Sequence, residues 1–268
     1  MKGIVKAVIA GCIIIGIGVA ILLLALGLNG WTFTPNYQMT TYSTEDEEIT
    51  TPVDTVKLNF KAGKIKTEFY DGEFITVKYP KIENYNTDIE VADGVLSFTG
   101  PNKLHWYSFP LGWGNLPETV IKLPQNTTFN LDFTISGGTA TINNGTIEGA
   151  KIVMNAGKIT VSNVAVNSTF ECTMNAGAAE MENVTCNGSF DFTTNFGGAK
   201  INRLTCNDIT LNTNAGGIEL NILGIKSDYT VTIDNSVAGC NIEEQVGTTD
   251  KTLTIETNAG GIEVEFVS

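Results

Sequence analysis

The sequence predicts an all-β fold, a single-stranded parallel β-helix (β-solenoid), preceded by one transmembrane helix. Three observations lead to this prediction. A motif recurs at intervals near 20 residues between Phe133 and Leu220, apolar side chains alternate with a period of two around it, and an uncharged apolar run lies near the N-terminus. Self-similarity at such an interval is typical of solenoids, whose units bury their apolar faces against one another.

Each copy of the motif has a polar anchor followed two residues later by glycine. The anchors are 19, 20, 20 and 19 residues apart: Ser136, Asn155, Asn175, Asn195 and Asn214. The glycines are expected at a corner with a positive φ, which glycine adopts at little steric cost. The anchor amides should then bond from one coil to the next. The predicted ladder is Asn155, Asn175, Asn195, Asn214 and Asn258 with Gly157, Gly177, Gly197, Gly216 and Gly260.

The apolar alternation defines which side chains face the core. Positions five and three residues before each anchor are apolar in every copy, and so are positions four and six residues after it. A further alternation follows, at Val164/Val166, Val184/Cys186, Leu204/Cys206 and Leu223/Ile225. Period two indicates strands, and the unit is too short for a helix with its loops. Each coil is therefore predicted to hold three short strands, in a right-handed solenoid of seven to eight coils.

Residues 1–28 are predicted to be a membrane anchor. The run Val8–Leu28 has 21 residues without a charge, enough to cross a hydrocarbon core of about 30 Å. Lys2 and Lys6 precede it, so the positive-inside rule places the N-terminus in the cytoplasm and the rest outside the cell membrane. A cleaved secretory signal is the alternative, but its apolar region would be shorter. In either case the domain that follows is exported from the cytoplasm.

Residues 29–53 are Thr-rich and carry the acidic cluster Glu45–Glu48, which predicts a solvated tether. The solenoid is predicted over 54–268, with Lys61 as the anchor of its first coil. An irregular insertion interrupts it at about 71–118 and contains a hairpin that turns on Asp93-Gly94. Two later anchors, Ser236 and Asn258, continue the repeat towards Ser268.

Four aromatic residues gather in the insertion: Trp106, Tyr107, Phe109 and Trp113. This loop could cover the open end of the first coil, because an uncapped β-helix exposes backbone edges and apolar side chains. Alternatively, some of the rings stay exposed as a binding surface, since aromatic rings stack well on sugars. We expect the cap, and both interpretations remain open.

The residues available for chemistry favour a protein that is not an enzyme. His105 is the only histidine and Arg203 the only arginine, so a His-rich metal site cannot form, and we expect no cofactor. A polysaccharide-active β-helix enzyme is the alternative, which a groove with two close carboxylates would favour. Cys186 and Cys206 occupy the same position of successive coils. Their spacing permits a disulfide, although we expect buried thiols there.

The formal charge of −13 makes nucleic acid a poor partner. The pattern Asn-Ala-Gly-Gly-Ile-Glu at Asn214–Glu219 and Asn258–Glu263, with the opening unit Leu58–Ile65, resembles the bacterial "putative adhesin" family, also called toastrack domains. The resemblance implies a cell-surface β-solenoid that binds or scaffolds at the envelope, with an unknown envelope protein or glycan as partner. A further alternative is an extracytoplasmic regulator that inhibits a membrane sensor.

Overall fold

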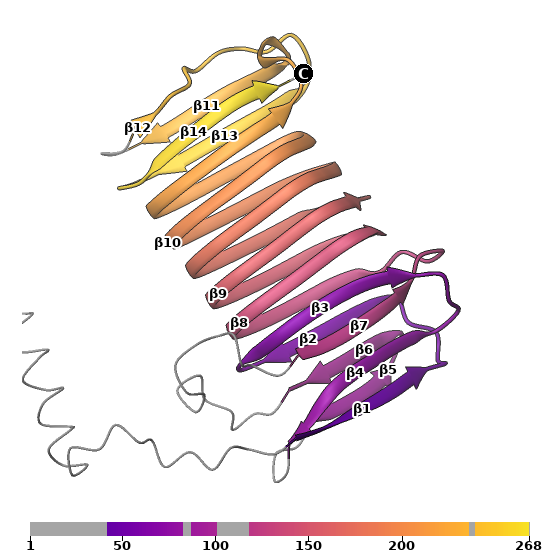
Figure 1. Cartoon of the computed structure of the whole chain (residues 1–268). Helices are drawn as coiled ribbons and strands as arrows, with labels where there is room; N and C mark the ends of the chain where they lie inside the picture. The colour runs from indigo at the N-terminus through magenta and orange to yellow at the C-terminus, as the bar shows by residue number, and fades with distance from the viewer. Residues whose placement is uncertain (1–41, 83–86, 101–117, 236–238, 268) are drawn as a thin grey trace, which may run out of the picture. The chain divides into compact units, whose positions relative to one another are not determined.

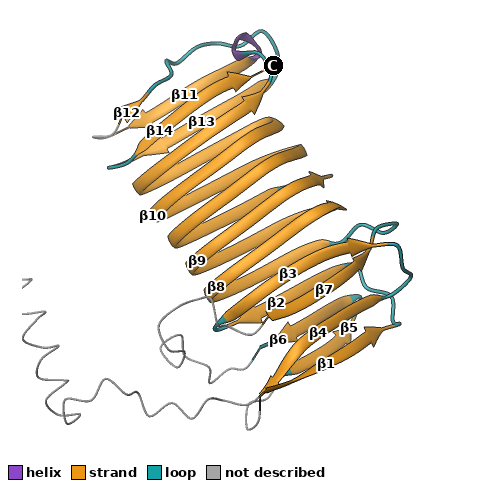
Figure 2. Cartoon of the chain, in the orientation of Figure 1, coloured by secondary structure: helices purple, strands orange, loops and turns teal. Residues whose placement is uncertain are grey.

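The computed structural model describes residues 42–82, 87–100, 118–235 and 239–267. Almost all of this part is β-strand, which confirms the all-β class, and the helix within it is the short 3-10 turn η3, Lys226–Asp228 (Figure 2). In these ranges no helix is long and apolar enough to cross a membrane. The predicted anchor Val8–Leu28 lies outside the described residues.

The strands stack as layers along one axis (Figure 1). Their bounds are β1 Tyr42–Ile49, β2 Thr55–Phe60, β3 Gly63–Tyr70, β4 Ile75–Ile82, β5 Asp88–Ala92, β6 Val95–Thr99, β7 Glu118–Pro124, β8 Asn130–Ile147, β9 Gly149–Val166, β10 Phe170–Leu223, β11 Tyr229–Asn235, β12 Gly239–Cys240, β13 Lys251–Thr257 and β14 Gly261–Val267. The three short strands expected in each coil are continuous through their corners. Consequently β10 alone contains three successive coils in 54 residues.

Neighbouring coils pair in parallel and in the register that the repeat predicts. Ile152 of β9 lies opposite Phe133 of β8 on one side and Cys172 of β10 on the other, and all three are fully buried. The rings of Phe170 and Phe190 are stacked, with centroids 5.3 Å apart. The predicted first coil is also in register, since Gly63 of β3 pairs with Gly138 of β8. The inward columns therefore form one continuous core.

The N-terminal end of the solenoid is covered by strands from the insertion. β6 and β7 form a layer outside β2 and β3, and β5 pairs antiparallel with β6. Asp93 and Gly94, with φ of 51° and 77°, make the predicted hairpin turn. The insertion, expected to be irregular, is thus largely strand where it is described. β1 adds to β4, so residues 42–49 are a strand and the tether prediction is wrong there, because the Glu45–Glu48 backbone completes a sheet edge.

At the C-terminal end the layers do not stack in chain order. β13 and β14 pair directly with β10, whereas β11 and β12 lie on the far side of β13 and β14. After β10 the chain skips the adjacent layer and forms β11 and β12 one layer further out. It then returns to fill the skipped layer with β13 and β14. Ile225, expected inside, is 66% exposed because the chain leaves its coil there. Instead, the buried Tyr229 of β11 faces the Cys206 coil from the C-terminal side, and its hydroxyl donates to the Cys206 carbonyl oxygen at 2.7 Å.

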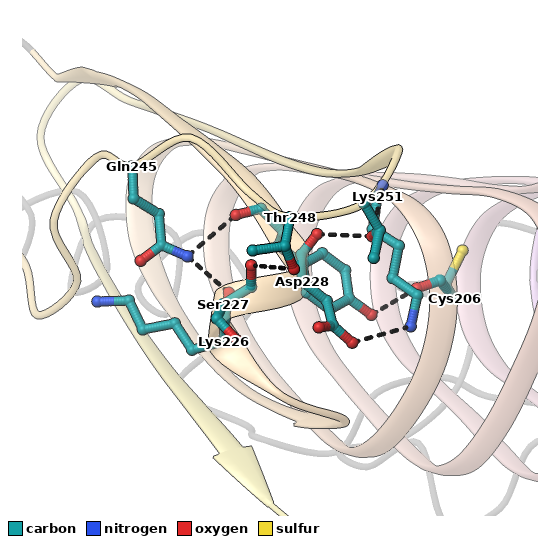
Figure 3. A network of polar contacts seen from close by, with 9 residues as sticks. Cys206, Lys226, Ser227, Asp228, Gln245, Thr248 and Lys251 are labelled. Carbon is teal, nitrogen blue, oxygen red and sulfur yellow. Dashed lines mark hydrogen bonds and ion pairs between the residues drawn. The ribbon is translucent and has the colours of Figure 1, made fainter.

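The outer edge of β11 is covered by the segment that connects β12 to β13 (Figure 3). Gln245 and Val231 exchange backbone hydrogen bonds of 2.8 and 3.2 Å. The Gln245 amide also donates to the carbonyl oxygens of Lys226 and Tyr229, at 2.6 and 3.0 Å. Thr248 and Ser227 are joined by a further backbone bond of 2.8 Å. These bonds satisfy edge groups that would otherwise be open to another strand.

Candidate binding groove

A column of glycines marks one corner of the solenoid, and there the fold requires glycine. A Cβ added to Gly157, Gly177 or Gly197 would lie 1.9–2.0 Å from the carbonyl oxygen of the corresponding glycine in the preceding coil. These residues also have φ near +140°, as predicted. Gly216 and Gly260 have no such φ, yet a Cβ there would still meet a neighbouring carbonyl oxygen at 2.0 and 2.1 Å. Close backbone approach therefore explains the whole column.

The predicted asparagine ladder runs beside this corner. Each amide donates to the side-chain oxygen of the asparagine one layer away: Asn175 to Asn155 at 2.7 Å, Asn195 to Asn175 at 2.7 Å, Asn214 to Asn195 at 2.5 Å and Asn258 to Asn214 at 2.6 Å. Asn258 donates to Asn214 because their coils are adjacent layers, although they do not follow one another in the chain. All of these predicted residues thus form one structural column.

A second column of glycines has no such packing reason. Gly198, Gly217, Gly261 and Gly239 each lie one residue after the corner position. A Cβ on the first three would meet its nearest neighbour at 3.5–3.9 Å, which is ordinary contact, and one on Gly239 would meet nothing within 4 Å. Glycine in a strand costs conformational entropy and often marks a place where a ligand approaches closely. We take this column as the candidate site.

These glycines and Ala178 form the floor of an open groove of about 830 Å³. Its floor crosses β10, β14 and β12 in the order Ala178, Gly198, Gly217, Gly261 and Gly239, as the strand pairing shows. Five layers with a spacing of about 4.8 Å make the floor roughly 19 Å long. The volume is in the range of small-molecule sites, roughly 300–1,000 Å³. The long, shallow shape fits an extended chain.

Charged and polar side chains line one side of the groove. They lie two residues after the floor positions: Glu180, Lys200, Glu219, Glu263 and Asn241. The Lys200 Nζ lies 2.9 Å from a Glu219 carboxylate oxygen, and this hydrogen bond raises the pKa of Lys200. A second ion pair of 2.6 Å joins Lys158 to Glu180. The row therefore offers a hydrogen-bond donor or acceptor at each layer.

Two carboxylates of this row lie close together. Glu219 and Glu263 are paired on adjacent parallel strands, so the groove meets the carboxylate criterion that would favour a polysaccharide-active enzyme. However, the Glu219 side chain is 50% exposed and ion-paired, whereas a general acid is usually kept protonated by burial. Within the described ranges, no group of three or more His, Cys, Asp or Glu is placed to hold a metal ion.

An exposed aromatic ring lies near the groove in the chain. Phe196 is 65% exposed and precedes Gly198 by two residues, while the same position of the adjoining coils holds Ala176 and Ala215. Such a ring can stack on a sugar or another flat group. Neither Phe196 nor the second glycine column is among the residues predicted from the sequence, although the Gly-Gly pairs at 197–198, 216–217 and 260–261 are a visible signal.

The structure does not test the aromatic loop that the sequence predicts as a cap or binding surface. Trp106, Tyr107, Phe109 and Trp113 fall outside the described residues, so their role as cap or binding surface stays a prediction. The described cap at that end is made by β1, β4 and β5 outside β6 and β7.

Comparison with solved structures shows a related fold. A protein described as a "putative adhesin" from Bacteroides fragilis has a TM-score of 0.51 and 12% identity, over 84% of this chain and 97% of that chain. A "putative cell adhesion protein" from Clostridium sporogenes has a TM-score of 0.42 and 15% identity, over 85% and 100%. At these identities the likeness shows the fold alone. No curated protein matches the chain.

A family model described as Toastrack DUF4097 matches residues 53–267. The match runs from the first coil through the insertion to β14 and so spans the solenoid, and β1 precedes it. The chain belongs to the Toastrack DUF4097 family.

Proposed function

We propose that the chain is a non-catalytic, membrane-anchored cell-surface protein whose β-solenoid binds an extended glycan of the cell envelope. The residues of the groove and the adhesin name of the similar Bacteroides fragilis structure support an adhesin-like role. The uncharged run Val8–Leu28, preceded by Lys2 and Lys6, supports a single-pass anchor with the solenoid outside the cell.

The observation that carries the proposal is the second glycine column. Gly198 and Gly217 lie in the interior of β10 and Gly261 begins β14. Alanine would fit at all three positions, so glycine there costs stability without a packing gain. Because these glycines have no side chains, the space along the groove floor is open. A glycan can then lie directly on the backbone, with hydroxyls in reach of the row that contains Lys200 and Glu219.

Glycan binding is tested with substitutions that fill this open space on the groove floor. Gly198→Val with Gly217→Val puts β-branched side chains on the floor, which strands accept well. Binding to a panel of soluble envelope oligosaccharides, measured by isothermal titration calorimetry, should fall at least tenfold while the melting temperature is unchanged. Thr139→Val is the matched control, because Thr139 has the position of Gly198 and Gly217 in the coil of β8, two layers away from Ala178 at the end of the groove.

Three other results would contradict glycan binding in the groove or favour a different function. Equal affinity of the wild type and the filled-groove variant for the oligosaccharides would show that the groove is not the binding site. Release of new reducing ends, lost on Glu219→Gln, would support the polysaccharide-active enzyme. Deleting the gene and reading an envelope-stress reporter tests the regulator alternative, since an adhesin predicts no change in the reporter.

The topology is tested separately. Protease added to intact cells should remove the solenoid, while an N-terminal epitope stays protected until the membrane is opened. Release of the full domain into the medium would instead indicate a cleaved signal.

A further inference from the structure

Two cysteines in successive coils of β10 lie beside one another in the core. Cys186 and Cys206 are 3% and 2% exposed, and both are free thiols. Cys186 pairs with Val166 in the coil below, and Cys206 follows it by one repeat of 20 residues. Stacked positions of parallel strands are about 4.8 Å apart, within the Cα separation that disulfides permit.

Both sulfur atoms face the same short stretch of backbone. The Cys186 Sγ lies 3.1 Å from the Ser189 carbonyl oxygen, and the Cys206 Sγ lies 3.3 Å from the Gly188 carbonyl oxygen. Gly188 and Ser189 are consecutive residues of β10 at the corner between the two coils, and both are half-buried. The two thiols are therefore held side by side just beneath this corner.

We propose that Cys186 and Cys206 are a modification site, at which a peroxide forms a disulfide that joins the two coils. The Cys186 thiolate attacks one oxygen of the peroxide, the O–O bond breaks, and the leaving hydroxide takes up a proton as water. The Cys206 sulfur then gives up its proton and attacks the sulfenic sulfur. The S–S bond forms, the S–O bond breaks and a second water leaves, so two thiols are oxidised while one peroxide is reduced.

The surroundings of the two sulfurs assign the order of these steps. A hydrogen bond from the Cys206 thiol lowers the pKa of Cys186, whereas that bond and burial raise the pKa of Cys206. Burial of Cys186 and, to a smaller extent, the nearby Asp191 carboxylate oppose the lowering of its pKa in part. Cys186 is thus the attacking sulfur. Burial raises the pKa of Cys172 to about 12, so Cys172 is an internal control that should stay reduced.

The test uses the purified full chain, and it does not depend on the proposed function. After treatment with hydrogen peroxide and alkylation of free thiols, peptide mass spectrometry should find Cys186 linked to Cys206. In Cys206→Ser, whose hydroxyl keeps a donor beside Cys186, Cys186 should stop as a sulfenic acid that dimedone traps. Cys206→Val removes both the donor and the second sulfur, so its Cys186 should react more slowly. Val166 occupies this position in the coil next to Cys186, so the valine variant should fold. Cys172→Val should form the link as the wild type does.

Oxidation should also raise the melting temperature of the wild type by about 5 °C relative to the reduced protein, a gain that Cys206→Val lacks. Recovery of Cys186 and Cys206 as alkylated thiols after peroxide treatment, or a link to Cys172 or Cys240 instead, would overturn the proposal.

Discussion

Gly216 and Gly217 are neighbours in β10, yet a side chain would meet very different surroundings at the two positions. A Cβ on Gly216 would lie 2.0 Å from the Gly197 carbonyl oxygen, whereas a Cβ on Gly217 would approach the Gly261 carbonyl oxygen only to 3.9 Å. Gly216 therefore allows two layers to stack closely, whereas Gly217 leaves the floor of the groove open. The same Gly-Gly pair thus combines a structural residue with a candidate binding residue.

Gly216→Ala should lower the free energy of unfolding by about 2–3 kcal/mol, because the layers must separate to admit the methyl group. Gly217→Ala should leave it unchanged or raise it by about 0.5 kcal/mol, since alanine restricts the unfolded chain. Urea denaturation followed by circular dichroism compares the pair. Similar losses in both variants would mean that the second glycine is structural as well.

Thr213 and Thr257 are a second case at the residue scale. They pair on adjacent strands, are 0% and 2% exposed, and their hydroxyls have no hydrogen-bond partner in the structure. In other coils the same position holds Met154 and Met174, so the core accepts apolar side chains there.

Thr213→Val should raise the free energy of unfolding by about 1 kcal/mol, because it removes a buried hydroxyl without changing the size of the side chain. Thr213→Ala is the control and should lower it through the cavity that it leaves. Chemical denaturation measures both. A loss of stability in the valine variant would show that the hydroxyl has a partner, such as a buried water.

At the scale of elements, the layer order has consequences for local stability. β11 has its parallel partner in β13, and β13 joins β10. The outermost layer therefore depends on the one that follows it in the chain. In a solenoid, stability is close to a sum of units and nearest-neighbour interfaces.

Leu253→Ala in β13 should lower amide hydrogen-exchange protection in both β13 and β11, since the fully buried Leu253 packs between β10 and β11. Val231→Ala in β11 should lower protection in β11 while β13 and β10 keep theirs. Mass-spectrometric hydrogen exchange distinguishes the segments. Loss confined to β13 in the first variant would contradict the observed layer order.

At the scale of the whole solenoid, both ends need protection from strand addition. The N-terminal end has antiparallel strands, with charged residues in β1 and β5, and the C-terminal end has the covering segment around Gln245. Charged edges and covered edges are two ways by which β-proteins avoid pairing with other chains.

Gln245→Pro should expose the β11 edge, because proline removes the N–H that binds Val231 and the amide that binds Lys226 and Tyr229. We expect concentration-dependent oligomers in size-exclusion chromatography with light scattering. Val246→Ala changes the adjacent, 89% exposed residue and should stay as the wild type. A monomeric Gln245→Pro variant would show that this segment does not guard the edge.

The sequence by itself determined the coil: the period, the inward columns, the corner glycines, the asparagine ladder and the hairpin on Asp93-Gly94. These features depend on local φ and on alternation of period two, which are visible in one chain. The structure merges the expected short strands, because pairing with neighbouring coils continues through the corners, which no single unit reveals.

Only the tertiary structure decided how the coils are ordered and where the groove lies. Coils of one repeat present nearly the same apolar face and backbone edge, as Thr213–Glu219 and Thr257–Glu263 show with identical residues, so local sequence does not specify which coil lies next to which. The connecting segments and the need to cover each end decide that order. The groove floor then depends on it, because Gly217, Gly261 and Gly239 are adjacent only in the stacked layers.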